Sequence, residues 1–125
     1  MLLALLLLSL MGLAATAQAQ TPLQASFDSV PDAPEVGQVV TFIDTTKTTL
    51  PYSRAWDLDG DGKFTDSEQA TPSKAFDAPG EHVVSLRVRR TGTNTQESVA
   101  QKTITVTAGV GVAVGVAFSV TVIVL

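Results

Sequence analysis

The chain has 125 residues, with 12 acidic against 8 basic side chains, no cysteine and a formal net charge of −4. This length suits one small domain, and the lack of cysteine excludes a disulfide-stapled scaffold. The acidic balance argues against a protein that binds nucleic-acid phosphates. The charges are unevenly placed, because the first 19 and the last 18 residues carry none.

Residues 1–19 predict a secretory signal peptide. A leucine-rich run is followed by small residues that end in Ala17-Gln18-Ala19, the pattern of a cleavage site. The basic residue that usually opens such a signal is missing, and an uncleaved anchor helix is the alternative. We therefore expect a secreted or cell-surface protein whose folded domain covers residues 20–107.

Residues 108–125 form a hydrophobic segment with conflicting patterns. Its length approaches what a membrane-spanning helix needs, and Gly111 and Gly115 have the spacing at which membrane helices pack closely. However, Val or Phe at every even position from 110 to 124 is a strand period. The segment is interpreted as a membrane anchor, as a truncated linker or strand of a further domain, or as an unstructured tail.

Between these ends, short alternating apolar segments are separated by turn residues. This pattern predicts an all-β fold, an immunoglobulin-like antiparallel β-sandwich of about seven strands with Trp56 at the centre of its core. The residues expected to face inward are Leu23, Ala25, Phe27, Val40, Phe42, Trp56, His82, Val84, Leu86, Val88, Ala100, Lys102, Ile104 and Val106. Arg87, Arg89 and Arg90 are expected as a basic stripe on the outer face.

An acidic loop is the most informative stretch of the sequence. Residues 57–68 fit the calcium-loop pattern D-x-[DN]-x-[DN]-G-x5-E at every position. A hard cation takes 6 to 8 oxygen ligands, and carboxylates at alternate positions of a tight loop converge on one point. The predicted ligands of a calcium ion are Asp57, Asp59 and Asp61, the backbone carbonyl of Lys63, Thr65 through water, and Glu68, with Asp66 as the alternative to Glu68. Phe64 is expected to point into the domain and tie the loop to the core.

Other interpretations of the loop were weighed against calcium binding. A solvated acidic turn leaves the mutual repulsion of five carboxylates without compensation. A helix-loop-helix EF-hand is disfavoured, because Ser53 to Trp56 has a strand pattern and Pro72 limits any exit helix. Paired glycosidase carboxylates are disfavoured, since a ligand cage surrounds one centre whereas a glycosidase needs two acids facing a cleft.

Several of these segments resemble a known family. The segments are Val40-Thr41-Phe42, the run from Trp56 to Gly62, Pro72 to Phe76, the strand from Pro79-Gly80 to Val88, and Ile104-Thr105-Val106. Together they resemble the PKD domain, an immunoglobulin-like sandwich named after polycystic kidney disease proteins, over about residues 23–107. His82 stands where the family usually has tyrosine, and the Asp-Gly segment is lengthened into a calcium-type loop.

The resemblance implies a non-catalytic module that contacts extracellular protein or carbohydrate, or spaces other domains. No catalytic constellation is found, and the only histidine, His82, is expected as a packed residue. The rival hypothesis is a polysaccharide-binding accessory domain truncated from a larger secreted hydrolase. A membrane tether through residues 108–125 belongs to the anchor interpretation.

Overall fold

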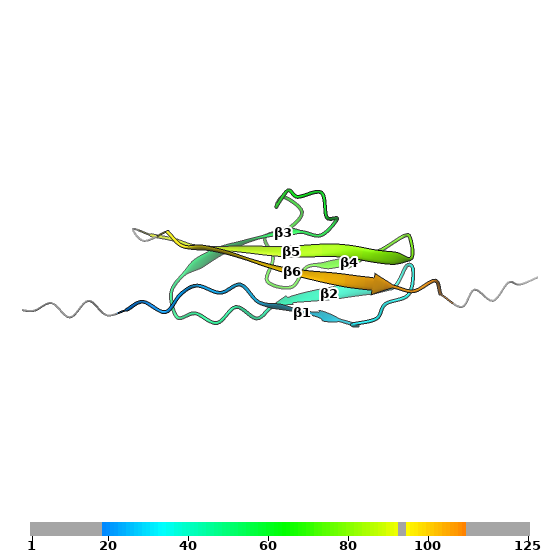
Figure 1. Ribbon diagram of the computed structural model, residues 1–125, viewed down its shortest axis with the longest axis horizontal. Helices are drawn as coiled ribbons and strands as arrows, with labels where there is room; N and C mark the ends of the chain where they lie inside the picture. The colour runs from blue at the N-terminus through cyan, green and yellow to red at the C-terminus, as the bar shows by residue number, and fades with distance from the viewer. Residues whose placement is uncertain (1–18, 93–94, 110–125) are drawn as a thin grey trace, which may run out of the picture.

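The structure, a computed structural model, describes residues 19–92 and 95–109. Their strands form two three-stranded antiparallel sheets that pack face to face (Figure 1). The strands are β1 (Phe27–Val30), β2 (Val39–Asp44), β3 (Tyr52–Asp57), β4 (Ser73–Ala75), β5 (Gly80–Arg90) and β6 (Glu97–Val106). One sheet has the order β1-β2-β4 and the other β3-β5-β6. The predicted all-β immunoglobulin-like sandwich is confirmed, with six strands in the described residues against about seven expected.

Trp56 lies at the centre of the core between the sheets, as predicted, and is fully buried. Its ring contacts Phe27 edge-to-face at a centroid distance of 5.1 Å and Phe42 at 6.1 Å. Such aromatic contacts stabilise by about 0.5 to 1.5 kcal/mol beyond the area they bury. Since Phe27 and Phe42 come from one sheet and Trp56 from the other, this cluster joins the two layers.

The segment after the acidic loop crosses from one sheet to the other. At its start, the amide of Trp56 donates to the carbonyl of Ser67 and the amide of Asp66 donates back to the carbonyl of Trp56. Further along, the amides of Asp44 and Phe42 donate to the carbonyls of Ala70 and Pro72, before β4 pairs with β2. One short connection therefore hydrogen-bonds to β3 of one sheet and to β2 of the other.

Two expectations about the strands need correction. Leu23 and Ala25 were expected in the first strand, but β1 begins at Phe27, and their amides donate to the side chains of Gln96 and Ser98 on the opposite sheet. Arg90 was expected on the outer face, but only 5% of its surface is exposed. The alternation of β5 explains this, because Arg90 follows Val88 by two residues and shares its inward direction.

The predicted signal peptide and hydrophobic segment lie almost entirely outside the described residues, which include only Ala19 from the first and Ala108 and Gly109 from the second. Across the part of the chain that the structure describes, no helix has the length and apolar character needed to cross a bilayer.

A buried carboxylate links β2 to β3 at the edge of the sandwich. The Asp44 side chain is 1% exposed, and its Oδ2 accepts from Arg54 Nε at 2.8 Å and from the Tyr52 hydroxyl at 2.9 Å. Its Oδ1 accepts from the Thr46 amide at 2.9 Å. Burial alone raises the pKa of Asp44, but the hydrogen bonds from Thr46, Tyr52 and Arg54 outweigh it, so the pKa lies below its ordinary value.

We expect Asp44→Asn to lower the free energy of unfolding by about 1 to 3 kcal/mol at neutral pH, because the amide cannot replace the charged acceptor. The folded-state pKa is depressed, so the stabilisation is complete above the unfolded value of about 3.9 and is lost as pH falls through the folded value. Urea unfolding from pH 7 to pH 2 should therefore show the two curves converging below about pH 4. Asp28→Asn, at an exposed position of neighbouring β1, is the control. If the difference in unfolding free energy between Asp44→Asn and the unaltered chain were the same at acidic as at neutral pH, the account would be contradicted.

Candidate metal centre

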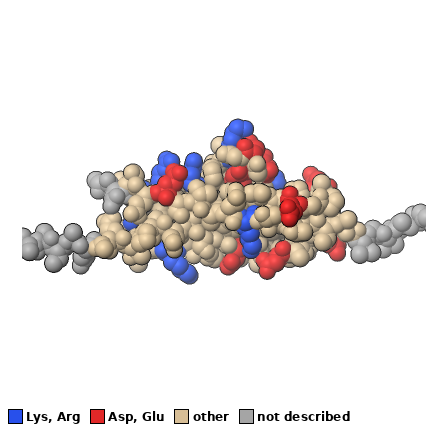
Figure 2. Space-filling model, in the orientation of Figure 1, with Lys and Arg blue, Asp and Glu red and all other residues tan. Residues whose placement is uncertain are grey.

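The acidic loop starts where β3 ends, and its foot is attached to the core residue Trp56. Besides the two backbone bonds to Ser67 and Asp66, the indole Nε1 of Trp56 donates to the carbonyl of Gln69 at 2.8 Å. The loop therefore leaves the sheet and returns to it at one residue. In Figures 1 and 2 it projects from the β3-β5-β6 sheet and carries a group of acidic side chains.

Three carboxylates of the loop converge. Asp57, Asp59 and Asp61 each offer an oxygen, and these three oxygens lie within 4.8 Å of one another. Asp57 is 3% exposed, and its two oxygens accept from the amides of Gly60 at 2.7 Å and Gly62 at 2.9 Å. The amide bonds fold the loop around the Asp57 carboxylate, so this side chain organises the turn.

Asp66 closes the loop from its other end. Its Oδ2 accepts from the amides of Leu58 at 2.7 Å and Asp59 at 3.2 Å. These bonds hold a fourth carboxylate at the point where the chain enters the loop. Asp66 therefore lies next to Asp59 in the hydrogen-bond network, although it is not one of the three converging carboxylates.

The remaining predicted ligands lie further out. Lys63 and Thr65 are exposed, and Lys63 Nζ donates to Asp61 Oδ2 at 2.8 Å while its amide donates to Asp61 Oδ1. The hydrogen bonds from Lys63 hold the pKa of Asp61 below its ordinary value. Glu68 is outside the group of converging carboxylates and lines a hollow of about 120 Å³ on the outer face beside Arg54 and Arg87.

The loop rests on β5 through two contacts. The guanidinium of Arg87 lies over the Phe64 ring, 4.6 Å from the ring centroid. Phe64 therefore ties the loop to the outer face of the sheet, and the expectation that it would point into the core is wrong. Gly60, with φ of +76°, approaches the carbonyl of Val83 so closely that a Cβ placed there would lie 3.1 Å from the oxygen. A guanidinium over an aromatic face is attracted by about 0.5 to 2 kcal/mol.

The donors of the loop suit a hard divalent cation. Carboxylate oxygens are what Ca²⁺ prefers, and an oxygen that accepts one amide hydrogen keeps a second lone pair for a metal. Asp57, Asp59 and Asp61 would hold such an ion, together with the Lys63 carbonyl. The ion would supply positive charge among mutually repelling carboxylates, and the chain's own residues shape the turn.

Solved structures similar to this chain are β-sandwich modules. One, described as a carbohydrate-binding module of the β-sandwich superfamily with promiscuous specificity, is 27% identical with a TM-score of 0.57, over 73% of this chain and 36% of that chain. The PKD1 domain of the Vibrio cholerae metalloprotease PrtV is 23% identical with a TM-score of 0.53, over 70% of this chain and 100% of its own. The PKD1 domain of Vibrio anguillarum Epp is 22% identical with a TM-score of 0.54, over 72% and 99%.

No family model and no curated protein matches the sequence. The solved structures nevertheless define the class of fold, which is a PKD-like β-sandwich of the kind found in accessory modules. The resemblance drawn from the sequence is therefore confirmed at the level of the fold. The calcium loop is a property of this chain's own residues and remains a prediction.

Two glycine substitutions test whether the loop rests on β5. Gly62→Ala should cost about 1 kcal/mol, since its φ is +84° but no atom lies within 4 Å of the added methyl group. Gly60→Ala should cost roughly twice as much, because the methyl group also meets the Val83 carbonyl. The measurement is the free energy of unfolding in denaturant with chelator present. Equal costs for the two variants would show that the loop stands clear of β5.

Proposed function

We propose that this chain is a non-catalytic extracellular module in which a calcium ion held by the acidic loop stabilises the sandwich. The observation that supports this most strongly is the convergence of Asp57, Asp59 and Asp61 at the end of β3. Asp57 is buried and shapes the loop before any ion binds, so the loop is organised in advance for a cation. Preorganisation of this kind lowers the entropy lost on binding.

The ligand set is proposed to include Asp66 in preference to Glu68. Asp66 is held at the mouth of the loop by the amides of Leu58 and Asp59, whereas Glu68 lies among arginines on the sheet face. The Lys63 ammonium on Asp61 is a competing cation, and calcium binding would displace it. Affinity should then be low, in the range of about 0.1 to 1 mM typical of extracellular modules.

The role proposed for the module is contact with extracellular protein or carbohydrate, or the spacing of other domains. The solved structures of similar fold are PKD domains and a carbohydrate-binding module, which are non-catalytic modules. One of them is the PKD1 domain of a metalloprotease. The predicted signal peptide supports placement of this module outside the cell or at its surface.

A second candidate is a polysaccharide-binding accessory domain of a larger secreted hydrolase. The observation that favours it is the likeness to a carbohydrate-binding module, of which this chain covers 36%. In this interpretation the calcium loop keeps its structural role, and a face or end of the sandwich binds the glycan. The two candidates therefore share the same calcium test and differ in partner.

Calcium should raise the thermal midpoint of the full chain. At ten times the dissociation constant the stabilisation is about 1.4 kcal/mol, which is about 5 to 10 °C for a domain of this size. Trp56 is the only tryptophan and is bonded to residues 66–69 at the foot of the loop, so its fluorescence reports unfolding at the relevant place. No rise up to about 10 mM calcium would overturn the proposal.

Charge-neutral variants separate the ligands from the scaffold. Asp59→Asn and Asp61→Asn should abolish the calcium-induced rise, and Asp66→Asn should weaken it by about tenfold in calcium concentration. Glu68→Gln is the matched control in the same loop and should respond as the unaltered chain does. A loss of the calcium response in Glu68→Gln, with Asp66→Asn unaffected, would exchange the roles of these two residues.

A further inference from the structure

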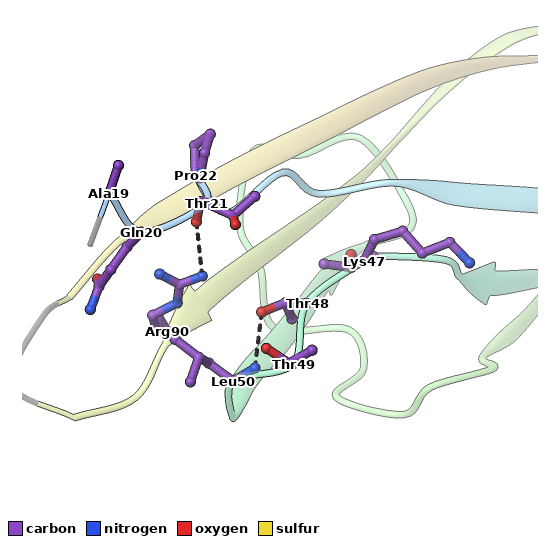
Figure 3. A pocket seen from close by; sticks show the side chains of 10 residues that line it. Ala19, Gln20, Thr21, Pro22, Lys47, Thr48, Thr49, Leu50 and Arg90 are labelled. Atoms are coloured by element: carbon purple, nitrogen blue, oxygen red, sulfur yellow. Dashed lines mark hydrogen bonds between the residues drawn. The ribbon is translucent and has the colours of Figure 1, made fainter.

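A hollow of about 650 Å³ lies where residues 19–22, residues 46–50 and the end of β5 meet. The segment entering the domain, residues 19–22, forms one wall, and the loop after β2, residues 46–50, forms the other (Figure 3). Arg90, the last residue of β5, lies between the two walls. None of the described residues that line this end pocket is acidic, and two of them, Arg90 and Lys47, are basic.

Arg90 is a buried cation with neutral partners only. Its surface is 5% exposed, NH1 donates to the Gln96 side-chain oxygen at 2.9 Å, and NH2 donates to the Thr21 carbonyl at 3.3 Å. Its Nε is buried and has no hydrogen-bond partner, and the ion pairs among the described residues do not include Arg90. A buried charge without a counter-ion is costly, so the site has positive charge that an anion would compensate.

The rest of the lining is suited to a sugar. Four threonines line the pocket. The Thr46 hydroxyl already donates to the Ser26 carbonyl and accepts from the Ser26 amide, whereas Thr48 Oγ1, which accepts from the Leu50 amide at 3.1 Å, retains its hydrogen to donate. Pro22 and Leu50 contribute apolar surface, and Leu50 is 41% exposed. A sugar ring presents C–H groups on its faces and hydroxyls at its edge, which match these two kinds of surface.

We infer that the end pocket binds a uronic-acid residue of an acidic polysaccharide, with its carboxylate paired to Arg90, while Lys47 lines the same pocket with its side chain extending away from Arg90 (Figure 3). A guanidinium and a carboxylate form charge-assisted hydrogen bonds, often two in parallel, and this supplies both affinity and orientation. A free peptide carboxylate would satisfy the charge but would make no use of the threonine hydroxyls. This inference rests on the proposed role as an accessory module, and it names the ligand class and the place where it binds.

The test is isothermal titration of the full chain with a short oligogalacturonide, in chelator so that calcium cannot bridge the acidic loop to the sugar. The methyl ester of the same oligomer keeps the sugar and removes the charge. We expect binding of the acid and at least about tenfold weaker binding of the ester. Arg90→Gln should weaken binding of the acid by about tenfold or more and Lys47→Ala by less, whereas Lys74→Ala on distant β4 should leave it unchanged.

Because Arg90 is buried, its variant is first checked by thermal unfolding, and the comparison of acid with ester in the unaltered chain decides the matter if Arg90→Gln does not fold. Equal binding of acid and ester, or an equal loss in Lys74→Ala, overturns the inference. Binding of a sulfated dextran oligomer as tightly as the uronide also overturns it, since that result means general attraction of anions. If the uronide fails while calcium still raises the thermal midpoint, the proposed function stands and only this ligand assignment is lost.

Discussion

Trp56 is the residue on which both the fold and the candidate metal centre depend. Its ring fills the space between the sheets against Phe27 and Phe42, while its amide, carbonyl and indole nitrogen all bond to residues 66–69. A displacement of the ring would therefore disturb the loop foot, and a disturbance of the loop would reach the core. The conformation of the loop and the stability of the sandwich are coupled through this one residue.

The same connection explains why a small sandwich of two three-stranded sheets holds together. After leaving Trp56, the chain bonds to the edge of β2 at Ala70 and Pro72 and then pairs as β4. The buried Asp44 and Arg54 pair joins β2 to β3 beside it. A domain of this size buries a limited apolar area, so polar links between layers contribute a larger share of the stability.

Charge is unevenly distributed over the molecule. Residues 57–68 contain five acids and one lysine, which equals the whole net charge of −4, so the remainder of the chain is balanced. Figure 2 shows the acidic side chains on the projecting loop, with basic ones mainly on the half of the molecule where β5 ends. The proposals accordingly place a cation at the loop and an anion beside Arg90, each where the local field favours it.

The sequence by itself determined the class of fold, the central place of Trp56 and the acidic loop, because strand alternation and ligand spacing are local patterns. Strict alternation along β5 would also have placed Arg90 inward. The expectation that it lies on the outer face was wrong because Arg90 was grouped with Arg87 and Arg89 by charge. Only the tertiary structure decided that Phe64 lies over Arg87, that Asp66 bonds to the start of the loop while Glu68 lies beside Arg87, and that residues 19–22 and 46–50 enclose Arg90. The physical reason is that these contacts form between segments that are distant in the sequence and meet only through tertiary packing. The spacing of residues along the chain does not predict which outer face or which end of the sandwich a loop will cover.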